Sequence, residues 1–409
     1  MREIQEFTLE ELKAHLSEHA FSGQSVVLNM GPQHPSTHGV LRLILELDGE
    51  IIVNCIPDVG YLHTGIEKNM EAKTYQKAEV MVDRMDYMYT IGNTLVYTLA
   101  VEKLTGLKSP PRSDAIRVIL TELSRIQAHL LWLGTSGMDL AALSIFLYTM
   151  REREMVLDIF ELVSGARMMT TFIRPGGLWR DVPVEFESQV RNFIKVLPKR
   201  IVEYESLLTR NPLFLDRTKG IGIIDTKTCL AYDVTGPTLR GSGMAYDVRK
   251  ANPYSGYDQY DFDIPTQTEG DIYARYLVRI EEMRQSLRII EQVLDKLPYG
   301  PVRDPNYKFV PPPRSEIGVS MEALIHHFKL WTEGFTPPPG SVYVTIESPR
   351  GEMGVFLESN GTPKPYRVHY RTPSGPLLHA LPVISKGCFV ADMVGIIGSI
   401  DIVLGDCDR

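Results

Sequence analysis

Cysteine is scarce in this sequence of 409 residues, and the few cysteines lie far apart. The four are Cys55, Cys229, Cys388 and Cys407, so no C-x-x-C pair occurs. Such pairs are a common redox and metal-binding arrangement, whereas dispersed cysteines are typical of proteins kept in a reducing compartment. The spacing therefore predicts a cytosolic setting and no iron–sulfur cluster held by this chain itself.

Long apolar runs and basic runs are also absent. A transmembrane helix needs about 20 consecutive apolar residues, and the best candidate, residues 393–405, is shorter and contains Asp401. The net charge is −8 without a run of lysine or arginine, which argues against a general nucleic-acid-binding protein. The first residues, MREIQEFTLEELKAHL, are acidic and amphipathic, unlike a secretory signal. We expect a soluble protein, or one that reaches a membrane through partners.

Helical periodicity dominates the middle of the chain. With 44% hydrophobic residues the chain can bury a sizeable core. From about residue 64 to 211 apolar residues recur at helical spacing, and four long helices there imply a packed bundle. Residues 212–267, rich in glycine, tyrosine and aspartate, predict a long ordered loop. The predicted helices are 87–104, 110–133 (stopped by the GTSG segment), 138–163, 184–208 and, after the loop, 271–297.

β-Strands are predicted near both ends of the chain. Leucines at every second position from 41 to 47 precede an Asp48–Gly49 turn, which is typical of a β-hairpin. Residues 341–359 and 365–371 predict further strands, with short helices at 320–332 and 392–399. The expected fold class is α+β: a mainly helical core with a small N-terminal β-sheet and a C-terminal β region. The predicted division is 1–63 for an N-terminal helix and the sheet, 64–300 for the helical core with its loop, and 301–409 for the C-terminal β/α region.

The segment MGPQHPSTHGV at residues 30–40 contains two histidines, His34 and His38, in a loop between two predicted strands. Its prolines exclude a helix. A zinc site needs three or four ligands, and no third candidate lies nearby in the sequence. Two interpretations stay open. One is a histidine that exchanges protons, since imidazole titrates near neutral pH; the other is a polar turn between the strands with no catalytic role.

Two further polar groups also allow two interpretations. The stretch RMDYMYT gathers Arg84, Asp86, Tyr87 and Tyr89 at a predicted helix start. These side chains either line a pocket or belong to a capped helix with aromatic core residues. Asp139 follows the GTSG segment, where it is either functional or simply an acid favoured near a helix N-terminus.

Several stretches together bear a specific resemblance to a known family. They are GPQHPSTHGVLRL, GYLHTGIEK, RMDYMY, LAVEKL, PPRSDAIRVILTELSRIQAHLLWLG, YDVRKANPYSGY, ESPRGEMG and the ending DIVLGDCDR. These segments resemble the D-type subunits of bacterial NADH–quinone oxidoreductase, the 49 kDa family of respiratory complex I. Such a subunit is the large quinone-site subunit of the peripheral arm, and the resemblance runs from about Val26 to Arg409.

A second resemblance, to the large subunits of nickel–iron hydrogenases, implies the fold of the core. Those proteins carry R-x-C-x-x-C near the start and D-P-C-x-x-C-x-D-R near the end, and the four thiolates hold a metal pair. In this chain Asp86, Tyr89, Val403 and Asp406 stand at the four thiolate positions, and Cys407 is one place off. Because such a site selects soft thiolates, the resemblance implies a retained cavity with no metal.

The family resemblance implies quinone reduction, which takes two electrons and two protons. Tyr87 and His38 would be the proton donors at the two quinone carbonyls, and Asp139 would hold the histidine. His38, Tyr87, Val403 and Asp86 would line the quinone pocket. No cofactor would be bound permanently by this chain, since the electrons would come from the terminal [4Fe–4S] cluster of the adjacent small subunit.

The resemblance also implies partners and a location. The partners would be the small iron–sulfur subunit (B-type), the C-type subunit, the membrane subunit of the H-type and other complex I subunits, with no nucleic acid. The protein would lie at the cytoplasmic side of the bacterial cell membrane as a peripheral part of a proton-translocating enzyme. Two alternatives remain: a metal-dependent hydrogenase subunit, which would need the four thiolates, and a structural scaffold, which would tolerate loss of Tyr87.

Overall fold

The computed structural model describes residues 25–33, 39–140 and 142–409. His34 and His38, the two histidines of the loop after the first strand, lie outside the described residues, as does the predicted N-terminal helix. No helix in the described ranges is both long enough and apolar enough to cross a membrane.

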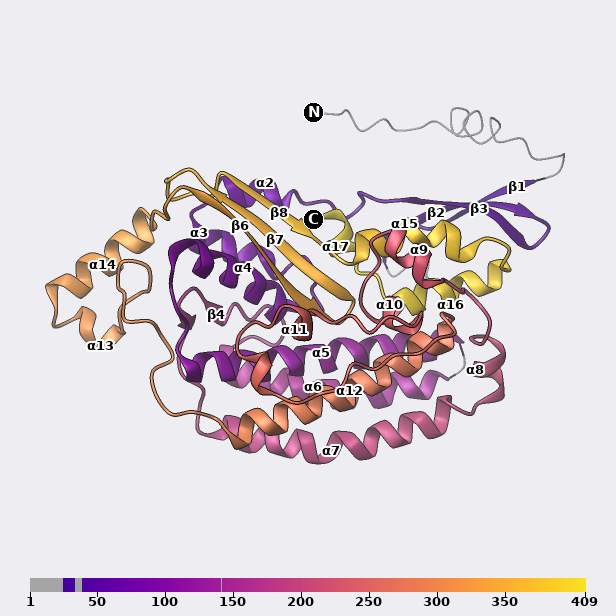
Figure 1. The fold of residues 1–409 in the computed structure, drawn as a ribbon, viewed down its shortest axis with the longest axis horizontal. Helices are drawn as coiled ribbons and strands as arrows, with labels where there is room; N and C mark the ends of the chain where they lie inside the picture. Colours follow the sequence, from indigo (N-terminus) through magenta and orange to yellow (C-terminus); the bar gives the residue numbers. More distant parts are fainter. Residues whose placement is uncertain (1–24, 34–38, 141) are drawn as a thin grey trace.

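Four long helices form a bundle in which α5 packs against α6 and α12, and α7 closes the far side (Figure 1). Their facing side chains make one continuous apolar core, in which the predicted stripe from Ile116 to Leu133 on α5 is buried. A helical bundle is therefore confirmed, although its fourth helix is α12 and not the predicted helix 87–104, which packs on the C-terminal sheet instead. The helices are α5 Pro111–Leu140, α6 Leu143–Ser164, α7 Glu185–Leu208 and α12 Ile272–Asp295, preceded by α2 Ile66–Glu71, α3 Tyr75–Val82 and α4 Thr90–Thr105.

Two small antiparallel sheets flank the bundle, which confirms the α+β class. Strands β1 Val26–Met30, β2 Arg42–Asp48 and β3 Ile51–Asp58 follow the order β1-β2-β3. Near the C-terminus β6 Gly340–Ser348, β7 Gly351–Ser359 and β8 Arg367–Arg371 form the second sheet, which packs on α4. A two-stranded ribbon, β4 Ile173–Arg174 with β5 Gly177–Leu178, completes the strands of the described ranges.

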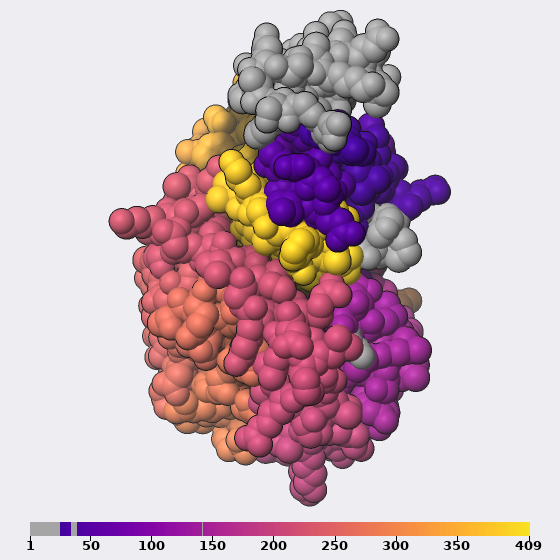
Figure 2. All heavy atoms as spheres, turned by 90° about the vertical axis from the view of Figure 1, so that its right-hand side faces the viewer, coloured from indigo at the N-terminus to yellow at the C-terminus, as the bar shows by residue number. Residues whose placement is uncertain are grey.

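The N-terminal sheet lies beside the segment that precedes α16 Val390–Ile400. Glu50 and Ile52 of the N-terminal sheet exchange backbone hydrogen bonds with Cys388 and Val390, for example Ile52 N to Cys388 O at 2.9 Å. Figure 2 shows the residues near the C-terminus against the N-terminal strands at one end of the molecule. One apolar core combines both segments with part of the 212–267 region. The division of the chain into 1–63, 64–300 and 301–409 stays a prediction. Residues from all three ranges contribute to this one apolar core.

The expected end of α5 at the GTSG segment is wrong, and with it the expected start of the next helix at 138. The helix continues through Gly134 and Gly137 because both glycines face α6 at close range. A Cβ added at Gly134 would lie 2.4 Å from Thr149 Oγ1, and one at Gly137 would lie 3.0 Å from Ile145 Cγ2. The glycines are therefore packing positions that let two helices approach, and not helix stops.

The segment predicted as a loop is ordered but carries short helices. Side chains set several of their N-termini: Asn211 accepts a hydrogen bond from Leu213 N, Asp225 from Thr228 N and Asp247 from Arg249 N. Helices this short bury too few side chains to leave a periodic pattern, so the sequence did not indicate them. They are α8 Pro212–Asp216, α9 Thr226–Ala231, α10 Pro237–Gly241 and α11 Val248–Ala251, with a 3-10 turn η2 at Tyr257–Gln259.

The C-terminal region follows the prediction but adds three helices, α13, α15 and α17. The predicted helices at 320–332 and 392–399 are confirmed, whereas α15 was not foreseen because Pro376 and Pro382 interrupt its sequence. The elements are α13 Arg314–Ile317, α14 Met321–Thr332, α15 Ser374–Ser385, α16 Val390–Ile400 and α17 Leu404–Asp408.

Gly236 provides a test of how the 212–267 region holds the turn between β6 and β7. Its φ is +73°, and an added Cβ would lie 2.3 Å from the Arg350 carbonyl oxygen. Gly220 has a φ of +71° but open space around it. Gly220→Ala should cost about 1–2 kcal/mol of stability from the left-handed backbone alone, while Gly236→Ala should cost about 1–3 kcal/mol more, because the Arg350 backbone must move.

Thermal unfolding of the two purified variants measures this difference. Equal melting temperatures for Gly236→Ala and Gly220→Ala would contradict the tight contact with Arg350.

Candidate functional site

Four charged side chains from distant parts of the sequence meet in the interior and are called here the carboxylate cluster: Asp86, Arg350, Asp401 and Asp406. All four are buried. Arg350 Nη1 donates to Asp86 Oδ2 at 2.8 Å, its Nε donates to the Asp401 carbonyl at 2.7 Å, and its Nη2 lies 3.3 Å from Asp401 Oδ1. One guanidinium thus joins the turn before α4 to the end of α16.

The local backbone brings the two chain segments together. Asp401 ends α16 with φ 53° and ψ 50°, which turns the chain toward α17. Gly405 in α17 then lies against the turn before α4, where an added Cβ would be 2.5 Å from Met85 O. Ser374 ties the same segment down, since its N–H donates to Asp406 Oδ2 and its Oγ accepts from Val403 N, both at 3.3 Å.

The cluster contains more acid than base. Three carboxyl groups surround one guanidinium, and Asp406 Oδ1 and Asp401 Oδ2 are buried with no hydrogen-bond partner in the described part of the chain. Burial raises the pKa of Asp406 to about 7, and the neighbouring Asp86 carboxylate contributes to the rise. Burial also raises the pKa of Asp86, although Arg350 opposes this. Asp406 is thus a buried carboxyl that takes up or releases a proton near neutral pH.

Tyr87 lies beside this cluster, half-buried. Burial raises the pKa of its phenol, opposed by the Arg350 guanidinium, so the hydroxyl stays protonated at neutral pH. No hydrogen bond joins this hydroxyl to any residue that the structure describes. Tyr89 differs: it is fully buried and donates to the Glu347 carbonyl at 3.2 Å. Of the two tyrosines in RMDYMY, Tyr89 is thus the core aromatic, whereas Tyr87 has a donor to offer a ligand.

The positions compared with hydrogenase thiolates are only partly gathered. Asp86 and Asp406 meet in the cluster, and Val403 is buried at the start of α17. Tyr89 instead points to the β6–β7 hairpin. Burial keeps the pKa of the Cys407 thiol well above its ordinary value, and the acids beside it add to this, so the sulfur is a poor metal ligand. Within the described ranges no group of three or more His, Cys, Asp or Glu side chains could hold a metal ion.

Asp139 occupies the last turn of α5, half-buried. The interpretation of Asp139 as an acid near a helix N-terminus is therefore wrong, because this residue lies at the C-terminal end of α5. A carboxylate at that end opposes the helix dipole. The end of α5 contacts α16, because Trp132 Nε1 donates to Gly398 O at 2.6 Å and Ser136 Oγ reaches the same oxygen at 3.4 Å. Helix α16 therefore leads from the end of α5 to the carboxylate cluster. His38, the proposed partner of Asp139, lies outside the described residues.

Sequence reasoning missed Arg350 and Asp401. Arg350 stands in a Pro–Arg–Gly turn of a β-hairpin, a position at which a charged residue usually faces water. It is buried here because this turn inserts between the turn before α4 and the end of α16. The stretch ESPRGEMG contained the only signal, through its resemblance to the family.

Comparisons with known proteins agree on one family. The sequence model of the family described as "Respiratory-chain NADH dehydrogenase, 49 Kd subunit" matches residues 139–409. The chain is 60% identical over 389 residues to the D-type subunit numbered 2 of the NADH-quinone oxidoreductase of Chloroflexus aurantiacus, covering 94% of this chain and 95% of that protein. It is 58% identical over 389 residues to the D-type subunit numbered 1 of the NADH-quinone oxidoreductase of Roseiflexus castenholzii, covering 94% and 93% of the two chains.

The raised pKa of Asp406 predicts a pH-dependent stability. The ordinary value is 3.8 and the folded value is about 7. Between these values the unfolded chain ionises while the folded chain keeps its proton, so this residue lowers stability as the pH rises from about 4 to 7. Asp406→Asn cannot ionise, and its melting temperature relative to wild type should rise by on the order of a few °C between pH 5 and pH 8.

Melting curves of the purified protein at several pH values measure this, with the exposed Asp258→Asn as the control. A difference between Asp406→Asn and wild type that stays constant with pH would show that Asp406 is ionised throughout.

Proposed function

The chain belongs to the 49 kDa subunit family of respiratory NADH–quinone oxidoreductase, and we propose that it supplies the quinone-reducing site of such a complex. The observation that carries the proposal is the Tyr87 hydroxyl, which is free of hydrogen bonds to the described residues and lies beside the carboxylate cluster. A protonated phenol beside Arg350 and Asp86, in a cluster that also contains a carboxyl with a pKa of about 7, suits a reaction that consumes protons at one place.

Reduction of a quinone to a quinol adds two electrons to the ring system and one proton to each of its two oxygens. We propose that Tyr87 donates to one carbonyl and the imidazolium of His38 to the other. Asp139 would then orient and charge that imidazole. Asp86 lines the pocket and is held by Arg350, and the apolar Val403 contacts the quinone ring. Asp406 is suited to returning a proton to this region from within the protein.

The electrons come, in this proposal, from an iron–sulfur cluster in a neighbouring subunit. The spacing of the four cysteines supports this, because they lie far apart in the sequence and form no C-x-x-C pair. The neighbours would be the small iron–sulfur subunit (B-type), the C-type subunit and the H-type membrane subunit, which completes the quinone channel. The chain would then lie on the cytoplasmic side of the membrane, where quinone reduction drives proton translocation by the assembled enzyme.

A metal-dependent hydrogenase subunit is the less favoured function. It would need thiolates at positions where Asp86, Tyr89, Val403 and Asp406 stand, and carboxylate, phenol and isopropyl groups do not replace soft thiolate ligands. A purely structural scaffold would keep its contacts with other subunits without a hydrogen-bond donor at Tyr87. The two variants below therefore distinguish a scaffold from a quinone site.

Tyr87→Phe should lower the rate of quinone reduction by on the order of 10²-fold or more, since it removes one donor and leaves the ring in place. NADH oxidation by ferricyanide should persist, because that acceptor takes electrons upstream of this subunit. Tyr299→Phe is the control, since Tyr299 is 98% exposed. Steady-state rates of the assembled complex with both acceptors measure the effect. If the Tyr87→Phe variant reduces quinone at the wild-type rate, the scaffold function is favoured.

Asp139→Asn should slow quinone reduction by on the order of 10-fold or more without loss of assembly. Without the carboxylate the imidazolium of His38 loses its proton at lower pH, so the pH optimum should move to lower pH. The pH–rate profile of the membrane-bound complex measures this, with Asp258→Asn as the control. An unchanged profile would remove Asp139 from the mechanism.

A further inference from the structure

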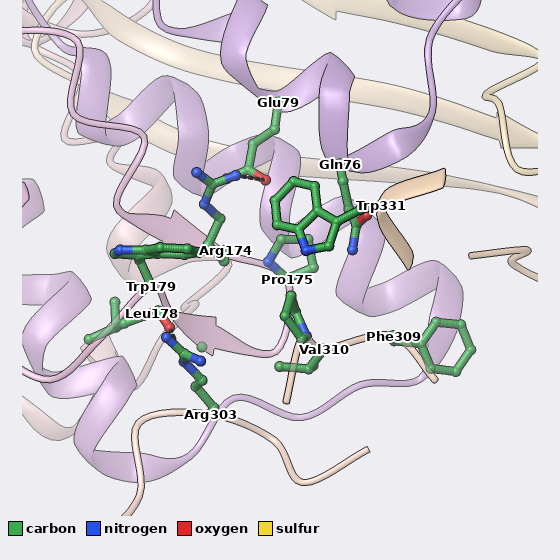
Figure 3. Close-up of a pocket in the computed structure, with 12 residues that line it drawn as sticks. Gln76, Glu79, Arg174, Pro175, Leu178, Trp179, Arg303, Phe309, Val310 and Trp331 are labelled. Atoms are coloured by element: carbon green, nitrogen blue, oxygen red, sulfur yellow. Dashed lines mark hydrogen bonds and ion pairs between the residues drawn. The ribbon is translucent and has the colours of Figure 1, made fainter. Parts of the chain in front are cut away.

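A pocket lies apart from the carboxylate cluster, none of whose residues line it. Its lining combines α3, the β4–β5 ribbon, the segment after α12 and α14 (Figure 3). We call it the arginine pocket and define it by Glu79, Arg174, Trp179, Arg303 and Trp331.

The polar groups of the arginine pocket are left incompletely paired. Glu79 is fully buried, and its Oε2 accepts from Arg174 Nη1 at 3.4 Å. Glu79 Oε1 and Arg174 Nε are buried without a hydrogen-bond partner in the described part of the chain. Arg303 uses its Nε for the Leu178 carbonyl at 3.1 Å, and its terminal nitrogens bond none of the described residues. Unsatisfied buried groups of this kind require a ligand or a solvent molecule.

The charge balance of the pocket favours an anion. Both guanidinium groups lie over the Trp179 ring, each 5.7 Å from its centroid. Burial raises the pKa of Glu79 to about 8, so this acid neutralises little of their charge at neutral pH. Burial lowers the pKa of Arg303, and the positive charge of Arg174 lowers it further. The Trp179 ring lies between the two guanidinium groups (Figure 3), so a carboxylate binds either of them from that group's own side of the ring and offsets the positive charge of the pocket.

The neighbouring helix α14 exposes an apolar stripe, although a surface helix normally turns its apolar face inward. Leu324 is 51% and Phe328 64% exposed, and Met321, Ile325 and Trp331 continue the stripe at helical spacing. Trp331 also lines the arginine pocket. The stripe and the pocket therefore form one continuous surface. In Figure 1, α13 and α14 project from the end of the molecule opposite α16.

We propose that the α14 stripe and the arginine pocket are one docking surface for another protein subunit of the complex. That partner places apolar side chains on the stripe and the carboxylate of an aspartate or glutamate against the terminal nitrogens of Arg303, which bond none of the described residues. Arginine forks bind carboxylates in two-point geometry, which gives the contact its specificity. The contact is expected from the family membership of the chain and does not depend on the quinone assignment.

Photo-crosslinking in the assembled complex tests the occupant directly. A benzoylphenylalanine placed at Phe328 adds a reactive ketone to an exposed ring and leaves the core unchanged. Mass spectrometry should find it joined to a different subunit, close to an aspartate or glutamate of that subunit. Crosslinks only to this chain or to a second copy of it, or no crosslink at all, would overturn the proposal.

Charge reversal tests the pocket. Arg303→Glu should reduce the assembled complex recovered from membranes by on the order of 10-fold, because the partner carboxylate then meets a like charge. Replacing the crosslinked partner acid by arginine should restore assembly with Arg303→Glu. Wild-type assembly of Arg303→Glu, failure of this restoration, or a small anion in the pocket of the intact complex would overturn the proposal.

Tyr87→Phe should assemble normally, so a failed quinone assignment remains distinguishable from a failed docking surface.

Discussion

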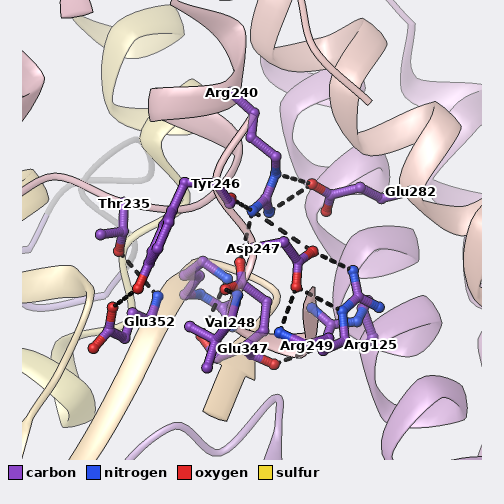
Figure 4. A network of polar contacts seen from close by, with 12 residues as sticks. Arg125, Thr235, Arg240, Tyr246, Asp247, Val248, Arg249, Glu282, Glu347 and Glu352 are labelled. Atoms are coloured by element: carbon purple, nitrogen blue, oxygen red, sulfur yellow. Dashed lines mark hydrogen bonds and ion pairs between the residues drawn. The ribbon is translucent and has the colours of Figure 1, made fainter. Parts of the chain in front are cut away.

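The structure depends on a buried network of ion pairs that ties the helical bundle to the C-terminal sheet (Figure 4). Arg240 on α10 bonds Glu282 of α12 at 2.7 Å and Glu347 of β6 at 2.8 Å. Arg249 on α11 bonds Asp247 at 2.7 Å and Glu122 of α5 at 3.1 Å. Every one of these side chains is buried. The short helices of the 212–267 region thus supply the cations that join α5, α12 and β6.

The network is stable only as a whole. Despite burial, Arg249 lowers the pKa of Asp247 to about 2, and Arg240 lowers that of Glu282. Removing one partner of such a pair leaves a buried charge uncompensated, which costs about 3–5 kcal/mol, whereas forming the pair from water gains little. The network therefore contributes specificity: it fixes one arrangement of the helices and the sheet, because any other arrangement would separate the charges.

This arrangement sets the position of the candidate site. The Glu347 carbonyl accepts from Tyr89 Oη at 3.2 Å and from Arg125 Nη2 at 2.6 Å, which fixes the end of β6. Arg350 follows in the next turn and joins Asp86 to Asp401. Local patterns could predict the α5 stripe, the Asp48–Gly49 hairpin and the β6–β7 hairpin, because each depends on neighbours in the sequence. They could not predict the carboxylate cluster, in which Asp86 and Arg350 are separated by 264 positions.

The charge of the carboxylate cluster connects the fold to the proposed chemistry. A site that held a metal would balance its ligands with the charge of the metal. Here Asp86, Asp401 and Asp406 are offset by Arg350, by the charge of Arg279 acting on Asp401 and by a proton on Asp406. Arg350 is fixed by the turn and cannot leave, but a proton on Asp406 can, since burial places its pKa at about 7. Among the described groups of the cluster the mobile positive charge is thus a proton, and Arg350 and Asp86 act on both Asp406 and Tyr87. A substrate whose reduction consumes protons therefore suits this cluster better than a metal bound through thiolates does. The burial that raises the pKa of Asp406 is supplied by the same packing that the ion-pair network holds in place.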